Sequence, residues 1–137
     1  MEKQSLILVR GLPGSGKTDF AKIIADGKEK AIILSTDNYF TDANTGEYKF
    51  DARKLGAYHQ RCFEECYSYL EAGWTVIVAN TFSKKSEMEN YLNAASELDI
   101  RVYTIVMEHR HDGTNIHNVP PEVINSMYNR FEIKLKK

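Results

Sequence analysis

A glycine-rich loop, residues 11–18, limits the fold of this chain more than any other segment does. It reads Gly-Leu-Pro-Gly-Ser-Gly-Lys-Thr and matches the G-x-x-x-x-G-K-[ST] phosphate-binding (Walker A) pattern in full. The apolar run at residues 6–9 precedes it and reads as a buried strand, and a helix-compatible stretch, residues 18–25, follows it. Since the motif requires a strand before the loop and a helix after it, the context predicts a strand–loop–helix unit.

The residue types of the glycine-rich loop have a chemical reason. Its glycines let backbone N–H groups approach phosphate oxygens, and the start of the following helix adds partial positive charge. Lys17 would reach the β- and γ-phosphates of a nucleoside triphosphate, and the Thr18 hydroxyl would help to hold Mg²⁺. The residues expected to bind ATP are Gly11, Pro13, Gly14, Ser15, Gly16, Lys17 and Thr18. A loop that binds nucleotide without driving chemistry is the alternative.

Length and charge restrict the remaining possibilities. A chain of 137 residues is expected to form one domain, residues 1–137, with a substantial core. The net charge of −1 gives no overall attraction to nucleic acid or to a membrane surface. The chain opens without a signal-like segment, and no apolar stretch is long enough to span a bilayer. We therefore expect a cytoplasmic protein with no membrane partner.

Apolar runs alternate with helical patterns along the chain, which is typical of a parallel α/β sheet. The predicted strands cover residues 6–9, 31–34, 75–79 and 102–107. The predicted helices cover residues 16–25, 52–72, 85–98 and 122–133. Gly73 is expected to end the second helix, and a Pro-Pro pair opens the last one.

Polar side chains follow the predicted strands. Asp37 follows the second strand, Asn80 and Thr81 follow the third, and a polar loop, residues 109–119, follows the fourth. Ligands of such sheets bind at the carboxyl ends of the strands. This gathering of polar groups at one edge indicates an enzyme rather than a scaffold.

Asp37 is the first candidate for catalysis. Transfer of a phosphoryl group to a hydroxyl needs an acceptor for the hydroxyl proton, and a carboxylate beside the glycine-rich loop is well placed to be that base. Alternatively, Asp37 contacts Mg²⁺ through water. It also lies in a Ser-Thr-Asp-Asn sequence that suits the capping of a helix or turn.

Other residues at the same edge are candidates for substrate contacts. Asn80 and Thr81 could orient substrate or Mg²⁺-bound water, or simply form a strand-end turn. In the loop after the fourth strand, Arg110 could close over the transferring phosphoryl group, and His117 could do so in part; a solvated loop is the alternative. Lys84, at the start of a predicted helix, is either a binding residue or a solvated charge.

Aromatic and thiol side chains allow further interpretations. Tyr39, Phe40, Tyr48 and Phe50 could stack on a base or pack in the core. Cys62 and Cys66 lie on one face of the predicted 52–72 helix with His59. We interpret the cysteines as two reduced thiols, because structural zinc requires four ligands and no fourth is evident.

Four segments together carry a resemblance to a known family. They are the strand and loop at 6–18, Ser-Thr-Asp-Asn-Tyr-Phe at 35–40, Val-Ile-Val-Ala-Asn-Thr-Phe at 76–82 and Asn-x-His-x-Val-Pro at 115–120. The chain resembles the polynucleotide-kinase-like P-loop kinases, in particular their small stand-alone AAA-type ATPase relatives of bacteria and bacteriophages. The resemblance extends over nearly the whole chain.

The resemblance implies a three-layer α/β/α P-loop NTPase fold, ATP with Mg²⁺ as cofactor, and transfer of the γ-phosphoryl group to a hydroxyl. In its motif Lys17 and Thr18 have the phosphate and magnesium roles, Asp37 stands at the position of the general base, and the loop before Val119 stands at that of the lid. Phe40 occupies the place at which polynucleotide 5′-kinases have an acceptor-binding arginine.

We therefore predict an ATP-dependent kinase whose acceptor is a nucleic-acid 5′-hydroxyl or a nucleotide-like molecule. Lys17, Asp37 and Arg110 are the predicted catalytic residues, and Thr18 and Asp37 the predicted metal-binding residues. Two alternatives remain: an ATP-binding regulatory module with weak or no ATPase activity, and a kinase of a small molecule.

Overall fold

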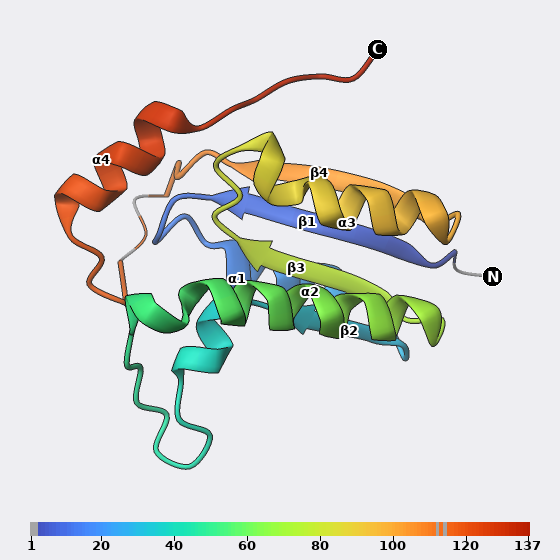
Figure 1. Ribbon diagram of the computed structural model, residues 1–137, viewed down its shortest axis with the longest axis horizontal. Helices are drawn as coiled ribbons and strands as arrows, with labels where there is room; N and C mark the ends of the chain where they lie inside the picture. The colour runs from blue at the N-terminus through green and yellow to red at the C-terminus, as the bar shows by residue number, and fades with distance from the viewer. Residues whose placement is uncertain (1–2, 112, 114) are drawn as a thin grey trace.

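The computed structural model describes residues 3–111, 113 and 115–137 (Figure 1). Strands and helices alternate along these residues, as the sequence predicts. The strands are β1 (Ser5–Gly11), β2 (Ala31–Leu34), β3 (Thr75–Asn80) and β4 (Arg101–Met107). The α-helices are α1 (Lys17–Ala25), α2 (Leu55–Glu71), α3 (Lys85–Glu97) and α4 (Pro121–Arg130), and η1 (Thr36–Phe40) and η2 (Ala52–Lys54) are short 3₁₀ helices.

The four strands form one sheet in the order β2-β3-β1-β4, and each neighbouring pair is parallel. The central strand β1 pairs with β3 on one side, where Val9 lies opposite Ala79, and with β4 on the other, where Val9 lies opposite Ile105. All four carboxyl ends therefore reach the same edge of the sheet. The predicted α/β class, with a mainly parallel sheet of about four strands, is confirmed.

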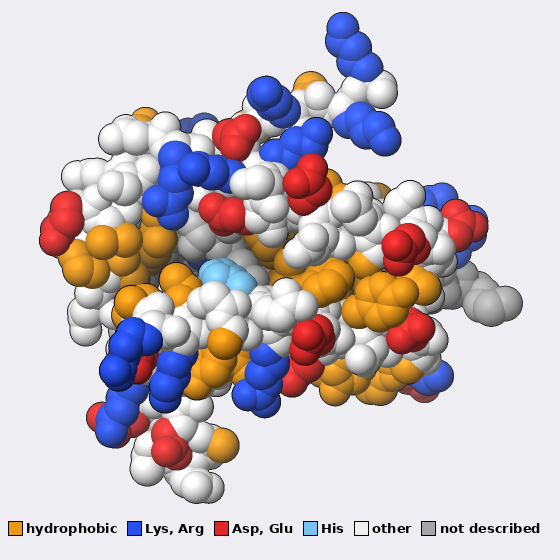
Figure 2. All heavy atoms as spheres, in the orientation of Figure 1, with side chains coloured by type: hydrophobic (Ala, Val, Ile, Leu, Met, Phe, Trp, Pro, Cys, Tyr) orange, Lys and Arg blue, Asp and Glu red, His pale blue; other side chains and the backbone are white. Residues whose placement is uncertain are grey.

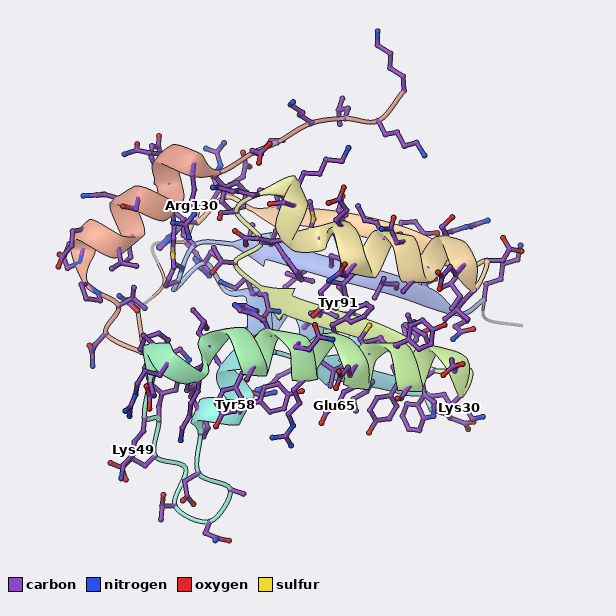
Figure 3. All side chains as sticks on the ribbon, in the orientation of Figure 1. Lys30, Lys49, Tyr58, Glu65, Tyr91 and Arg130 are labelled. Carbon is purple, nitrogen blue, oxygen red and sulfur yellow. The ribbon has the colours of Figure 1, made fainter. Side chains whose placement is uncertain are left out.

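Helices cover both faces of the sheet, with α2 and α3 on one face and α1 on the other (Figure 1). Successive strand residues point to opposite faces, so each strand contributes to both cores. The core under α2 and α3 includes Leu6, Leu8, Val76, Val78, Cys62, Cys66 and Tyr91, the last of which Figure 3 shows between the two helices. The core under α1 contains Ile7, Val9, Ala21, Ile77 and Ala79. This is the three-layer arrangement that the family resemblance implies.

The end of α4 differs from the prediction. The helix stops at Arg130 rather than near Ile133, because the next residues are extended and bonded to the sheet. The Glu132 N–H donates to the Ser83 carbonyl at 2.7 Å, and Nη2 of the buried Arg10 donates to the Glu132 carbonyl at 2.6 Å. Arg130, labelled in Figure 3, donates from Nε to Ser83 Oγ at 2.8 Å. These bonds replace the helical ones that the pattern predicted.

The predicted 52–72 helix also begins later. Residues 52–54 form η2, capped by the Asp51 carboxylate, which accepts from the Arg53 N–H at 3.0 Å. The α-helix itself then runs from Leu55 to Glu71, and Gly73, at φ 89°, follows it as predicted. Within the described ranges no helix is long and apolar enough to cross a membrane.

The carboxyl end of β3 binds the two segments on either side of it. Asn80 is buried, and its Oδ1 accepts the Thr36 N–H at 2.9 Å, at the start of η1. The Thr81 carbonyl accepts the Gly11 N–H at 3.2 Å, where β1 enters the glycine-rich loop. One strand end therefore fixes η1 and the glycine-rich loop relative to each other.

Replacing Asn80 with alanine is expected to lower the free energy of unfolding by about 1–3 kcal/mol, because the buried Thr36 N–H loses its acceptor. Urea denaturation followed by circular dichroism measures the loss. Asn90→Ala, on the exposed surface of α3, is the matched control and should leave stability nearly unchanged. Equal stability of the two variants would contradict the role assigned to Asn80.

Candidate active site

The glycine-rich loop joins β1 to α1 through a tight turn. Gly14 and Gly16 have positive φ angles of 83° and 88°, which side chains other than hydrogen disfavour. The Ser15 N–H donates to the Leu12 carbonyl at 3.1 Å. Ser15 Oγ is buried without a hydrogen-bond partner in the described residues. The turn thus ends at the amino terminus of α1, where backbone N–H groups attract anions.

Lys17 is held against the loop that precedes it. Its Nζ donates to the Gly11 carbonyl at 2.8 Å and to the Leu12 carbonyl at 3.2 Å. Burial disfavours the ammonium charge and lowers the pKa of Lys17 to about 8, while the negative charge of Asp37 acts in the opposite direction. The charges of Lys17, at the start of α1, and Asp37, in η1 after β2, therefore influence each other across the site.

Asp37 lies in η1 with its carboxylate available for contacts. Ser35 caps this helix, since its Oγ accepts the Asp37 N–H at 3.4 Å. The Asp37 carboxylate itself accepts from the Tyr48 hydroxyl at 3.3 Å, and its other oxygen lies 3.7 Å from His117 Nε2. Half of the Asp37 side chain is exposed. Capping chemistry thus falls to Ser35, and the carboxylate of Asp37 faces the site.

Tyr48 and His117 cover the carboxylate of Asp37 from two separate segments. Their rings stack with centroids 3.9 Å apart and planes 25° from parallel. Burial and the Asp37 charge raise the pKa of Tyr48 to about 12, so its hydroxyl stays protonated and donates. The Asn115 side chain bonds to both backbone groups of Val119 and shapes the turn that carries His117.

The other predicted site residues fall into two groups: some are exposed on the surface, and others hydrogen-bond to the backbone near the site. Arg110 is exposed and pairs with Glu108, with Nε 3.3 Å from Oε1. Lys84 is exposed at the residue before α3. Asn80 and Thr81 bond to backbone groups of η1 and of the glycine-rich loop, as described above. The structure therefore brings together Lys17, Asp37 and His117, and it sets Arg110 on the surface in an ion pair.

Two residues near the site were not among the predicted site residues. Tyr48 was noted only in an aromatic pattern, and its contact with Asp37 depends on an isolated bridge between Thr41 and Tyr48. His111 was noted only as a residue of the polar loop. A Cβ built on Gly16 would lie 2.6 Å from His111 Nε2, so this imidazole rests directly on the glycine-rich loop.

The oxygen donors of the site suit magnesium. Thr18 offers a hydroxyl from the exposed first turn of α1, and Asp37 offers a half-exposed carboxylate. Mg²⁺ is usually held by one or two such protein groups together with phosphates and water. Within the described part of the chain, no group of three or more His, Cys, Asp or Glu side chains could hold a metal by itself.

Of the remaining candidates, the two cysteines and Phe40 are buried in the core. Cys62 and Cys66 are free, buried thiols, and burial raises the pKa of Cys66 to about 12. His59 Nδ1 lies 3.1 Å from Thr36 Oγ1. Among the aromatic residues, Phe40 is buried, whereas Phe50 is 55% exposed.

Comparison with known proteins defines the family. Residues 6–132 match the AAA_33 family, described as an AAA domain, and the chain belongs to this family. Its fold is that of the P-loop kinases among its structural neighbours.

NEDD4-binding protein 2 of Homo sapiens is 36% identical to the chain over 94 residues. The match covers 64% of this chain but only 5% of that protein, so the chain spans a small part of this relative. Among solved structures, a chain of the Pnkp1/Rnl/Hen1 RNA repair complex superposes with a TM-score of 0.73 and 16% identity over 96% of this chain and 45% of that one. A gluconokinase from Sinorhizobium meliloti 1021 superposes with a TM-score of 0.62 and 16% sequence identity. The match covers 97% of this chain and 78% of the gluconokinase chain.

The pKa of Lys17 predicts how nucleotide binding depends on pH. Lys17 is an ammonium ion below about pH 8 and loses its charge as the pH rises through that value. The affinity for ATP should therefore fall between pH 7 and pH 9.5, and binding above pH 8 should take up protons. Calorimetry in buffers of different ionisation enthalpy measures both effects. Lys17→Arg stays charged and should lack this dependence; a flat profile for the natural protein would contradict it.

Proposed function

We propose that the protein is a Mg²⁺-ATP-dependent kinase that transfers the γ-phosphoryl group to a hydroxyl, with a nucleic-acid 5′-hydroxyl as acceptor. One observation carries the proposal. The half-exposed Asp37 carboxylate follows β2 at the same edge of the sheet as the glycine-rich loop and is held there by Tyr48, and its charge acts to raise the pKa of Lys17. This supports Asp37 as the proposed general base, acting beside the cation expected to hold the phosphate that is transferred.

The chemistry follows from these positions. The amides of the glycine-rich loop and Lys17 bind the phosphates of ATP. The acceptor hydroxyl gives its proton to the Asp37 carboxylate while its oxygen bonds to the γ-phosphorus. The bond from that phosphorus to the bridging oxygen breaks, and ADP leaves. When bound, Mg²⁺ would neutralise charge on the phosphate oxygens; Thr18 is proposed to hold it directly and Asp37 through a water molecule, so that the carboxylate stays free to take the proton.

The surroundings of Asp37 support an aromatic, anionic acceptor. Tyr48 lies beside the carboxylate and stacks on the His117 ring, and Phe50, two residues later in the chain, is exposed. Both aromatic rings can stack on a nucleic-acid base. Basic side chains gather over the start of α2 and the segment before it (Figure 2), where Figure 3 labels Lys49. Two of them, Lys49 and Arg53, pair with carboxylates while 76% and 89% exposed. Such exposed pairs are weak and can exchange for phosphates.

Two structural neighbours support the two candidate acceptors. One superposed chain belongs to the Pnkp1/Rnl/Hen1 RNA repair complex, which supports a nucleic-acid acceptor. The gluconokinase, which shares the same fold, supports a second candidate, a kinase of a small polyhydroxy compound. Both reactions use the same base, so they differ only in the molecule that reaches Asp37.

Asp37→Asn should keep the affinity for ATP and lose phosphoryl transfer by about 10²–10⁴-fold, the usual contribution of a general base. Transfer from γ-labelled ATP is measured with a 5′-hydroxyl oligonucleotide, with the same oligonucleotide carrying a 5′-phosphate, and with gluconate. Asp99→Asn is the matched control, because Asp99 is exposed in the turn between α3 and β4 and asparagine tolerates its φ of 54°. It should retain full activity.

Each arm of this experiment separates the candidates. Transfer to the 5′-hydroxyl oligonucleotide alone supports the proposal, and transfer to gluconate alone supports the small-molecule kinase. Flat, slow release of ADP with every acceptor indicates an ATP-binding regulatory module. Normal transfer by Asp37→Asn would show that Asp37 is not the base.

A further inference from the structure

The loop after β4 should supply positive charge or hydrogen-bond donors to the phosphates, and the sequence favoured Arg110 for this. The structure gives Arg110 a partner of opposite charge, since its Nε and Nη2 lie 3.3 and 3.4 Å from the two carboxylate oxygens of Glu108. Its side chain is 83% exposed. The next residue, His111, has the opposite placement and lies against the glycine-rich loop.

The contact of His111 with the loop is close and depends on two glycines. A Cβ built on Gly16 would lie 2.6 Å from His111 Nε2, 3.3 Å from Cε1 and 3.7 Å from Cδ2. A Cβ on Gly113 would collide with the Gly14 carbonyl and lie 2.8 Å from His111 Cε1. Any side chain at either position would push the imidazole away, so both glycines permit this approach.

We propose that the His111 imidazole binds the β- and γ-phosphates of the nucleotide held by the glycine-rich loop, and that it serves as the phosphate-binding side chain of the 109–119 loop in place of Arg110. The proposal rests on the proposed function only in taking ATP as the ligand. Gly16 directly precedes Lys17, whose side chain reaches the same two phosphates. The imidazole beside Gly16 therefore borders the place where these phosphates bind.

Imidazole chemistry suits this position. An Nε2–H donates to a phosphate oxygen in either the neutral or the protonated ring, and a bond to a charged acceptor is shorter and stronger than a neutral one. The centroid of the His109 ring lies 6.1 Å from that of the His111 ring, and the two ring planes are 87° apart. His117, by contrast, stacks on Tyr48 beside Asp37. The two imidazoles thus divide the site: His111 faces the nucleotide and His117 faces the acceptor.

Calorimetry with ATP, ADP and AMP, each with Mg²⁺ and without any acceptor, tests the proposal. His111→Ala should weaken ATP binding by about tenfold or more, which is the usual loss for a hydrogen bond to a charged group, and should weaken ADP binding by less. AMP binding should stay unchanged. His111→Gln keeps an N–H donor and should restore most of the ATP affinity. If His111 had only a structural role, the loss of affinity would not depend on the number of phosphates in the nucleotide.

The control is His109→Asn, in the same loop, since asparagine tolerates the φ of 65° at this residue. It should bind all three nucleotides as the natural protein does. Unchanged or tighter ATP binding by His111→Ala, with Lys17→Ala still defective, overturns this inference alone. A phosphate-dependent loss in His111→Ala without transfer to any acceptor overturns the kinase proposal alone. Failure of the natural protein to bind ATP overturns both.

Discussion

Two hydrogen bonds at the carboxyl end of β3 hold the parts of the site in register. The Asn80 side chain accepts from the first residue of η1, and the Thr81 carbonyl accepts from the last residue of β1. In the sheet β3 lies between β1 and β2. It therefore contacts both the strand that leads into the glycine-rich loop and the strand that leads into η1. The positions of Lys17 and Asp37 depend on β3 indirectly. Lys17 follows the glycine-rich loop, whose first residue makes one of these bonds, and Asp37 lies in η1, whose first residue makes the other. Asn80 therefore acts by positioning the segments that carry the chemistry.

The electrostatics of the site follow from this placement. Burial makes the charge of Lys17 costly and lowers its pKa, whereas the nearby carboxylate of Asp37 partly offsets that cost. Phosphates bound between the two would stabilise the ammonium further and would present the γ-phosphorus to the side from which Asp37 is proposed to deprotonate an acceptor. Tyr48 and His117 contact the carboxylate from two separate segments, while half of the Asp37 side chain stays exposed.

Local sequence patterns were sufficient to predict most of the strands and helices. They were insufficient to predict the contacts between loops. The motif at residues 11–18 predicted β1, the turn and α1, because its glycines and flanking periodicity are local requirements. The position of Asp37 after β2 was also readable, since parallel strands end at one edge. The capping function of Ser35, however, could be separated from that of Asp37 only by the side-chain contacts. The early end of α4 depends on Arg10 and Ser83, which are distant in sequence.

The polar loop shows the same limit most clearly. Charge alone favoured Arg110, but its side chain is exposed beside Glu108, whereas the side chain of the next residue, His111, lies against Gly16. The approach of His111 to Gly16 depends on Gly113, which lies against the Gly14 carbonyl, and no local sequence pattern predicts this contact. Tyr48 likewise reaches Asp37 only because a short antiparallel bridge brings it back over η1.

A crystal structure with a non-hydrolysable ATP analogue and Mg²⁺ tests the central claim most directly. The account predicts the γ-phosphate between Lys17 Nζ and the carboxylate of Asp37, with the carboxylate facing the side from which an acceptor oxygen would attack. A triphosphate bound to the loop with Asp37 turned away from the γ-phosphate, or out of reach of any group in line with the bridging oxygen, would contradict it.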